Sequence, residues 1–268
     1  MRNALATWCR RLPILLALVA VAGCVSLPQR VEGAFVERTL RLDGVDRRYQ
    51  VFVPSSAAAG RHPPVVVFLH GSGERGDDGL KPTLVGVGPY LRAHRDDFPA
   101  IVVFPQAPAG TEWSGNLPLV EATLDAALRE FRGDPRRVSV TGLSMGGYGV
   151  WDVALRTPGR FAALAPVCGG VLQPRAERDT LFVAAVAGEA DPYAAIARRL
   201  HGVPTWIFHG ARDDVVPPGD DRKLVAAFRA AGARDARYTE FADANHNSWD
   251  PAYAQTPGFW DWLLAQSR

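Results

Sequence analysis

The stretch Val138-Ser139-Val140-Thr141-Gly142-Leu143-Ser144-Met145-Gly146-Gly147-Tyr148 decides the fold. Alternating valines and small polar residues predict a buried strand over residues 138–141, and a helical pattern follows over residues 148–156. Between them lies a G-x-S-x-G sequence, whose glycines permit a tight turn and a close approach of backbone segments. Ser144 is therefore the candidate nucleophile, because such a turn exposes a serine hydroxyl above a sheet. An ordinary structural turn is the alternative.

Strands and helices alternate on both sides of this stretch. The continuous apolar runs are typical of parallel strands that are covered on both faces. We therefore expect an α/β protein with a mostly parallel central sheet and helices on both faces. Residues 35–53 alternate around Asp43-Gly44 and predict an N-terminal antiparallel hairpin. The other expected strands are residues 65–69, 101–104, 161–167, 205–208 and 237–241, and the other expected helices are residues 117–131, 220–231 and 259–265.

A serine hydroxyl is a poor nucleophile until a base removes its proton. In proteins with a G-x-S-x-G turn, the acid and then the histidine follow the serine along the chain. His246 is the only one of six histidines well beyond a plausible acid, which makes it the candidate base, with an exposed loop histidine as the alternative. The acid is expected after the strand 205–208, where Asp213 and Asp214 compete.

Acyl transfer also needs hydrogen-bond donors for the developing oxyanion. One candidate is the backbone N–H of Met145, directly after the nucleophile. The other is the N–H of Ser72, with Gly73 as second choice, in the loop that follows the strand 65–69. His70 in the same loop is interpreted as a structural residue at the strand end rather than a second base. Glu74 and Arg75 either border the cleft or pair with each other.

Five motifs occur in the order found in one known family. They are His70-Gly71-Ser72-Gly73-Glu74, Phe104-Pro105-Gln106-Ala107-Pro108, the G-x-S-x-G turn, residues 209–217 and residues 245–253. Together they resemble the phospholipase/carboxylesterase branch of the α/β-hydrolases. The most similar group is the secreted bacterial predicted peptidases, related to feruloyl-esterase-like enzymes. The resemblance covers residues 51–265, but residues 171–196 match the group poorly and are interpreted as a small insertion over the site.

This resemblance implies the α/β-hydrolase fold and a serine hydrolase that cleaves carboxylic esters through an acyl-enzyme. The family pattern H-G-x-x-D-x-x-V-P places the acid at Asp213 and leaves Asp214 as a loop neighbour. A serine peptidase on the same site and a catalytically inactive surface lipoprotein are the alternatives. The natural substrate and the oligomeric state are left open. Trp113, Trp151, Trp249 and Tyr253 either line an acyl pocket or belong to the core.

The N-terminal residues indicate export. Arg2, Arg10 and Arg11 precede a short apolar run over residues 12–23, which is typical of a signal peptide. Val21-Ala22-Gly23-Cys24 resembles a bacterial lipobox, which implies lipid on Cys24 and attachment to a membrane. We therefore expect a signal peptide over residues 1–23, a tether over 24–33 and the hydrolase domain over 34–268. The resulting bacterial lipoprotein is expected at the outer membrane or in the periplasm; an ordinary signal peptide or an uncleaved anchor is the alternative.

Composition excludes several other classes. The 268 residues carry a net charge of +2 without a basic block, so nothing indicates nucleic-acid binding. Asp77, Asp78 and His94 are too scattered to predict a metal site, and no phosphate-binding loop or other cofactor signal is present. With Cys24 lipidated and the signal removed, Cys168 is the only remaining thiol, so no internal disulfide is expected. Its apolar setting predicts a buried core residue.

Overall fold

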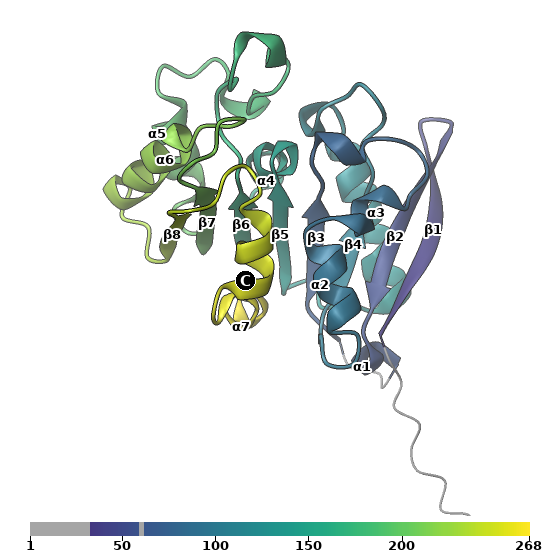
Figure 1. The fold of residues 1–268 in the computed structure, drawn as a ribbon. Coiled ribbons are helices and arrows are strands. Elements are labelled where there is room, and N and C mark those ends of the chain that lie inside the picture. The colour runs from purple at the N-terminus through teal and green to yellow at the C-terminus, as the bar shows by residue number, and fades with distance from the viewer. Residues whose placement is uncertain (1–32, 59–61) are drawn as a thin grey trace, which may run out of the picture. The chain divides into compact units, whose positions relative to one another are not determined.

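A single sheet of eight strands organises the protein in the computed structural model, which describes residues 33–58 and 62–268. The strands run in the order β1-β2-β4-β3-β5-β6-β7-β8 (Figure 1). Neighbours from β4 to β8 are parallel, whereas β1 and β2 add an antiparallel pair to the β4 edge. The strands are β1 (Ala34–Leu42), β2 (Val45–Val53), β3 (Val65–Leu69), β4 (Ile101–Phe104), β5 (Val138–Leu143), β6 (Ala163–Val167), β7 (Thr205–Gly210) and β8 (Ala236–Phe241).

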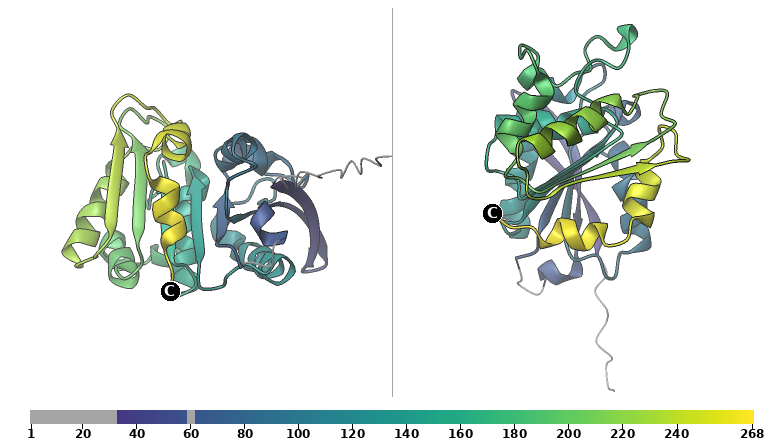
Figure 2. Two further views of the ribbon diagram at one scale, coloured as in Figure 1. Left: turned by 90° about the horizontal axis from the view of Figure 1, so that it is seen from below. Right: turned by 90° about the vertical axis from the view of Figure 1, so that its left-hand side faces the viewer.

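Helices cover both faces of the sheet (Figure 2). The α-helices are α1 (Ser55–Ala58), α2 (Val87–Ala93), α3 (Leu117–Phe131), α4 (Met145–Arg156), α5 (Pro192–Leu200), α6 (Gly219–Ala230) and α7 (Phe259–Ala265). Short 3-10 turns are η1 (Ser72–Glu74), η2 (Lys81–Leu84), η3 (Trp113–Gly115), η4 (Ala176–Arg178) and η5 (Ala184–Val186), and η6 (Pro251–Gln255) is a π-helical turn. None of the helices in the described ranges is long and apolar enough to cross a membrane.

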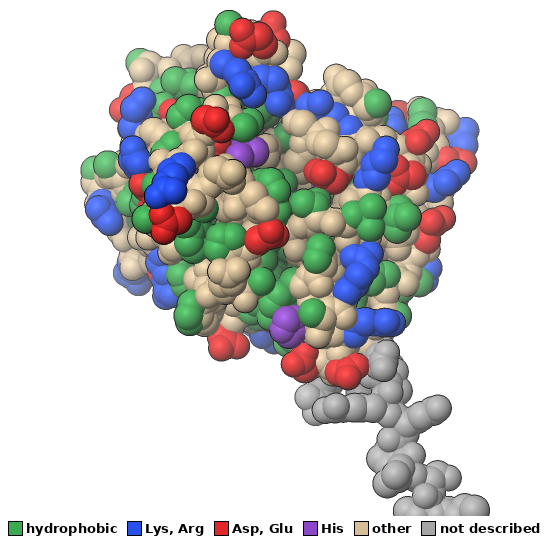
Figure 3. Space-filling view, viewed as in Figure 1, with side chains coloured by type: hydrophobic (Ala, Val, Ile, Leu, Met, Phe, Trp, Pro, Cys, Tyr) green, Lys and Arg blue, Asp and Glu red, His purple; other side chains and the backbone are tan. Residues whose placement is uncertain are grey.

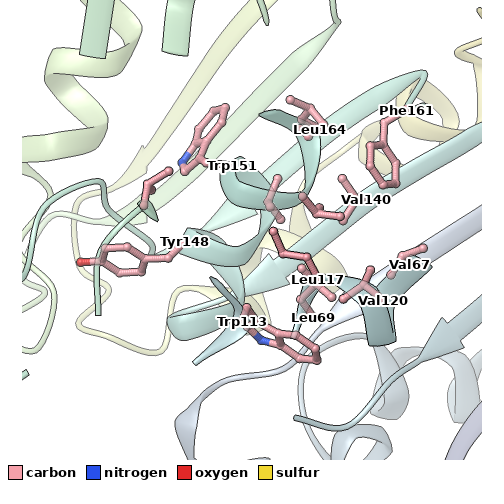
Figure 4. Close-up of a cluster of buried hydrophobic side chains, with 14 of the residues drawn as sticks. Val67, Leu69, Trp113, Leu117, Val120, Val140, Tyr148, Trp151, Phe161 and Leu164 are labelled. Carbon is pink, nitrogen blue, oxygen red and sulfur yellow. The ribbon is translucent and has the colours of Figure 1, made fainter. Parts of the chain in front are cut away.

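The central strand β3 explains why two hydrophobic cores form. Because side chains alternate along a strand, Val65, Val67 and Leu69 point to one face, while Val66 and Phe68 point to the other. The first face packs against α3, α4, α5 and α6, and the close-up in Figure 4 shows part of that core around Trp151 and Tyr148. The second face packs against α2 and α7. Burying each large apolar side chain stabilises the fold by roughly 1.5–3 kcal/mol.

The sequence-based expectations agree with this architecture. The α/β-hydrolase arrangement and the N-terminal hairpin are confirmed, and the hairpin turns at Asp43 and Gly44, both at positive φ. The strands expected at residues 65–69 and 101–104 and the helix expected at residues 117–131 have the expected bounds. Three helices have no counterpart among the expected elements: α1, α2, and α5, which begins inside residues 171–196 and continues beyond them. The expected signal peptide and lipidation residue Cys24 lie outside the described residues.

Candidate active site

The turn between β5 and α4 holds Ser144 in a strained conformation. Its φ of 53° and ψ of −118° are rarely adopted by a residue with a side chain. The backbone N–H of Ser144 donates to the carbonyl of Val167 at 2.9 Å, which ties the turn to β6. A Cβ atom on Gly146 would lie only 1.9 Å from the carbonyl oxygen of Leu69. The G-x-S-x-G pattern is therefore a steric requirement of this turn.

Ser144, His246 and Asp213 form one hydrogen-bonded chain. The Oγ atom of Ser144 lies 2.9 Å from Nε2 of His246, and Nδ1 of His246 lies 2.7 Å from Oδ2 of Asp213. Since a carboxylate only accepts hydrogen bonds, Nδ1 of His246 carries the proton and Nε2 is free to accept the serine proton. The three residues follow β5, β8 and β7, so the carboxyl ends of these strands bring them together.

Asp213 is held by four hydrogen-bond donors. Its Oδ1 atom accepts from the backbone N–H groups of Val215 and Val216, each at 2.9 Å. Its Oδ2 atom accepts from His246 and from His209, the latter at 3.1 Å. Burial acts to raise the pKa of Asp213, but these hydrogen bonds hold the pKa well below its ordinary value. Of the two competing aspartates, Asp213 contacts His246, whereas Asp214 is exposed.

The sequence analysis missed His209 as part of the site. This residue is the last but one of β7, is fully buried, and lies between Asp213 and Asp221 of α6. A signal was available: a histidine at the strand end precedes Asp213 by four residues and Asp221 by twelve. The first spacing brings both side chains to one side of the loop, but the second depends on how α6 packs.

The loop after β3 carries the second candidate oxyanion donor. Ser72 is the first residue of η1, and Met145 is the first residue of α4. The N–H groups at such positions have no acceptor within their own helix and remain available to a ligand. Ser72 lines the same cleft as Ser144 and His246. Both expected donors thus lie at helical starts beside the candidate nucleophile.

His70 holds the loop after β3 in place through hydrogen bonds. Its Nε2 atom accepts a hydrogen bond from the backbone N–H of Ala107 at 3.0 Å, and its Nδ1 atom donates to the carbonyl of Gly71 at 2.6 Å. Trp113 donates from Nε1 to the His70 carbonyl at 2.9 Å. Burial lowers the pKa of His70 to about 4, so the ring is neutral at pH 7. The structure therefore gives His70 the structural role expected from the sequence.

A cleft of about 220 Å³ opens above Ser144. Figure 3 shows histidine side chains at the surface in the upper half and near the lower edge of this face, the upper position close to acidic and basic side chains. The cleft is lined by Gly71, Ser72, Gly73, Glu74, Val85, Leu143, Ser144, Arg178, Val215, His246 and Trp249. Of the four aromatic residues considered above, only Trp249 lines it. Trp113, Trp151 and Tyr253 belong to the two cores.

The segment between β6 and α5 lies beyond the carboxyl ends of the strands (Figure 1). Arg178 of η4 donates to the hydroxyl of Ser72 at 2.8 Å and thereby joins this segment to the candidate oxyanion loop. Asp220 accepts from the backbone N–H groups of Val171 and Leu172, both at 2.9 Å. Asp152 accepts from the N–H of Ala185 at 3.0 Å. The segment expected as an insertion over the site is thus attached to α4 and α6.

A partly buried carboxylate contacts two arginines beside the cleft. Glu112 forms an ion pair with Arg75 at 2.6 Å, and Arg178 lies 3.6 Å from the same carboxylate oxygen. Arg75 therefore pairs with Glu112 rather than with Glu74, which lines the cleft instead. Burial raises the pKa of Glu74 above its ordinary value. Glu112 thus holds Arg75 and Arg178 together at the side of the cleft that Glu74 also lines.

Comparison with known proteins places the chain in a family. A family model described as the prolyl oligopeptidase family matches residues 120–266, more than half of the chain. The chain belongs to the prolyl oligopeptidase family. Ser144, Asp213 and His246 all lie within the matched residues. The expected membership of the α/β-hydrolases, with esterases among the relatives, is confirmed.

Individual relatives of this prolyl oligopeptidase family member include both esterases and peptidases. The S-formylglutathione hydrolase of Rattus norvegicus is 29% identical over 160 residues, which are 56% of this chain and 53% of that protein. A thermostable esterase of known crystal structure is 31% identical with a TM-score of 0.70, and the match covers 87% of this chain and 63% of that chain. The acylaminoacyl peptidase of Pyrococcus horikoshii, 14% identical with a TM-score of 0.63 over 86% of this chain and 40% of that chain, shares the fold. The chain thus spans about half the length of the curated relatives it matches.

The described residues of this prolyl oligopeptidase family member offer neither a metal site nor a reactive thiol. No cluster of three or more His, Cys, Asp or Glu side chains suited to a metal ion occurs in residues 33–58 and 62–268. Cys168 is fully buried at a φ of 42°, and burial raises the pKa of its thiol. A buried thiol with a raised pKa is a poor nucleophile, which agrees with the core role expected for it.

Proposed function

We propose that the protein hydrolyses carboxylic esters through an acyl-enzyme formed on Ser144. The observation that carries this proposal is the unbroken chain of hydrogen bonds from Ser144 Oγ through His246 to Asp213, at 2.9 and 2.7 Å. The similarity to a thermostable esterase over 87% of the chain supports an ester rather than another acyl substrate.

In the first half of the reaction, Ser144 Oγ attacks the ester carbonyl carbon while its proton passes to Nε2 of His246. The carboxylate of Asp213 keeps the ring in the required tautomer and stabilises the imidazolium that forms. The carbonyl oxygen becomes an oxyanion, which accepts hydrogen bonds from the N–H groups of Ser72 and Met145.

In the second half, the tetrahedral intermediate collapses and the bond to the leaving alkoxide breaks. His246 returns its proton to that oxygen, so an alcohol departs and the acyl group stays on Ser144. Water then attacks the acyl-enzyme with His246 again as base. The products are a carboxylic acid and the free serine.

The cleft favours a short acyl group. Its volume of about 220 Å³ is below the roughly 300–1,000 Å³ that is typical of sites for drug-sized ligands. Val85, Val215 and Trp249 supply apolar surface beside Ser144. A small apolar acyl chain can therefore lie against these side chains while its carbonyl carbon faces the nucleophile.

A substrate panel tests this function. p-Nitrophenyl esters of increasing acyl length, feruloyl esters and peptide amides are offered to the wild type, to Ser144→Ala and to the exposed control Ser267→Ala. We expect short-chain esters to react fastest, and Ser144→Ala to lose on the order of a million-fold in kcat. A fluorophosphonate probe should label the wild type and Ser267→Ala only. A protein that neither reacts with the probe nor hydrolyses any ester would support the inactive lipoprotein instead.

A serine peptidase is the second candidate, because the matched family is that of prolyl oligopeptidase. The same triad would cleave an amide if the leaving amine were protonated by His246. Faster turnover of peptide amides than of every ester in the panel would favour this candidate.

Export as a lipoprotein is proposed from the sequence. The basic residues, the apolar run and the Val21-Ala22-Gly23-Cys24 pattern support a signal peptide that ends before Cys24. Lipid on Cys24 would attach the hydrolase to a bacterial membrane, most simply the outer membrane. Without lipid on Cys24, the exported protein would instead be free in the periplasm.

A further inference from the structure

Behind the candidate triad lies a second, fully buried histidine. Both ring nitrogens of His209 contact only oxygen atoms. Nδ1 lies 2.7 Å from Oδ2 of Asp221, and Nε2 lies 3.1 Å from Oδ2 of Asp213 and 2.8 Å from the carbonyl oxygen of Val216. The side chains of His209, Asp213 and Asp221 are all 0% exposed, so water does not separate them.

The acceptors around the ring determine where its protons lie. A backbone carbonyl cannot donate, so Nε2 must carry a proton to satisfy Val216 and Asp213. Nδ1 faces a carboxylate, so one proton lies between Nδ1 and Asp221. Burial raises the pKa of Asp221 above its ordinary value. At His209, the hydrogen bonds to two carboxylates and a carbonyl outweigh burial and raise the pKa of the ring to about 10. The ring, which contacts both carboxylates, is the favoured site for this proton.

We propose that His209 is a positioning residue for the triad: as a buried imidazolium it fixes the carboxylate of Asp213, and through it keeps His246 neutral further into the acid range. The same oxygen of Asp213 contacts both rings, so two imidazolium ions would share one carboxylate oxygen. Like charges this close disfavour each other. The inference rests on the proposed function of Ser144 and His246.

The surrounding groups leave His209 as the nearest fixed cation. Five other ionisable side chains interact with His209, Asp213 or Asp221. They are Tyr148 of α4, Cys168 directly after β6, Asp220 of α6, and Tyr238 and Glu240 of β8. Burial raises the pKa values of the two tyrosines and the thiol, so all three stay neutral between pH 5 and 8. Arg222 lowers the pKa of Glu240 to about 2, so Glu240 stays charged over that range. None of these pKa shifts brings a titration into the range in which activity would be measured.

Nitrogen NMR of the histidine rings in the whole protein tests the charge state directly. We expect both nitrogens of His209 to remain protonated from about pH 5 to pH 8. The His209 signals are assigned by their change in Asp221→Asn. A His209 ring with one unprotonated nitrogen at pH 7 would overturn the proposal. This measurement requires no substrate. It uses the Asp221→Asn variant only to assign the His209 signals.

The pH dependence of kcat/KM tests the effect on the triad. In Asp221→Asn, the amide can donate to Nδ1, so His209 keeps its hydrogen bonds to Asp213 and Val216 but becomes neutral. The loss of this cation makes Asp213 a stronger partner for a protonated His246. We expect the acid limb of the profile to move up by about one pH unit, because a nearby charge typically shifts a titration by one to three units. The control Asp214→Asn, which changes an exposed carboxylate of the same loop, should leave the limb in place.

The two kinds of failure are distinguishable. An Asp221→Asn enzyme that is less stable but has the wild-type acid limb would show that His209 only supports the fold. If the wild type hydrolysed no substrate and did not react with fluorophosphonate, the proposed function would fail, whereas the NMR result on His209 would stand by itself.

Discussion

The guanidinium of Arg178 donates a hydrogen bond to the side-chain hydroxyl of Ser72, across 106 positions of the chain. This contact joins the segment after β6 to the loop that offers the candidate oxyanion donor. The hydroxyl itself takes no part in the proposed chemistry, because the donor to the substrate is the backbone N–H of Ser72. The hydrogen bond from Arg178 therefore positions the backbone N–H of Ser72 for the oxyanion.

A double-mutant cycle tests this role. We expect Arg178→Met and Ser72→Ala each to lower kcat about tenfold with little change in KM, because a misplaced donor is missed mainly in the transition state. The double variant should be no worse than either single variant, since both remove the same bond. Losses that multiply in the double variant would show that the two residues act separately. Arg175→Met, a change at a nearby exposed arginine, is the matched control.

Two neighbouring aspartates provide a test of the candidate acid. Asp213→Asn should lower kcat on the order of a thousand- to ten-thousand-fold, because an amide no longer stabilises the imidazolium of His246. Asp214→Asn should change kcat less than about tenfold, since its side chain points to solvent. Steady-state kinetics on both variants, with circular dichroism to verify folding, decide the assignment. A larger loss in Asp214→Asn would move the acid by one residue.

The turn itself should not tolerate a methyl group at Gly146. A Cβ atom there would meet the backbone oxygens of Leu69 and His70 at 1.9 and 2.9 Å. We expect Gly146→Ala to lower the free energy of unfolding by more than about 2 kcal/mol, as overpacking against rigid backbone does. Gly219→Ala is the matched control, because no atom lies within 4 Å of its added Cβ. Denaturant unfolding curves compare the two; equal midpoints would contradict the steric argument.

Stability at alkaline pH should depend on His209. Its pKa is raised from an ordinary value near 6.5 to about 10 in the folded protein. A group whose pKa is raised by folding stabilises fully below the unfolded value, and this contribution is lost as the pH rises towards 10. The wild type should therefore lose more stability between pH 6.5 and 10 than Asp221→Asn does. Denaturant unfolding of both proteins across this range measures the difference; parallel curves would show that His209 does not bind an extra proton.

Attachment to a bacterial membrane is expected to depend on lipid at Cys24. Intact-mass measurement of the mature protein from a bacterial membrane fraction should find an N-terminus at Cys24 with added acyl mass. Several acyl chains together hold a domain firmly to a bilayer. Cys24→Ser should release the protein or leave an uncleaved precursor, whereas Cys9→Ser should do neither. A mature N-terminus elsewhere, with no mass on Cys24, would exclude the lipobox.

The sequence predicted those strands and helices whose pattern of apolar and polar residues is readable within the segment itself. The run Val65–Leu69 is apolar throughout because both faces of β3 are covered, and this pattern is readable without the structure. Helix α2 was missed because Gly88 and Pro89 interrupt its short sequence, and the helix depends on packing against Thr83. For α5, a signal existed but was not used: Asp191 accepts from the N–H of Ala194 and precedes Pro192, a frequent pair at helix starts.

In the candidate site, too, residues with a local sequence signal were predicted, and residues that depend on distant partners were not. Ser144 and His246 are marked by their own neighbours in the sequence, and the family pattern distinguished Asp213 from Asp214. Arg178 could not be found in this way, because its partner Ser72 is distant in the chain and no local pattern links them. The pairing of His209 with Asp221 likewise depends on how α6 lies against β7.

Residues 172–182, which include Arg178, form a loop whose two ends are hydrogen-bonded. The N–H of Val183 donates to the carbonyl of Val171 at 2.9 Å. A surface loop whose ends meet can change in length and sequence without moving the elements on either side. None of the three triad residues lies within it. Residues 172–182 can therefore vary as one unit around the contact between Arg178 and Ser72, while the three triad residues keep their positions.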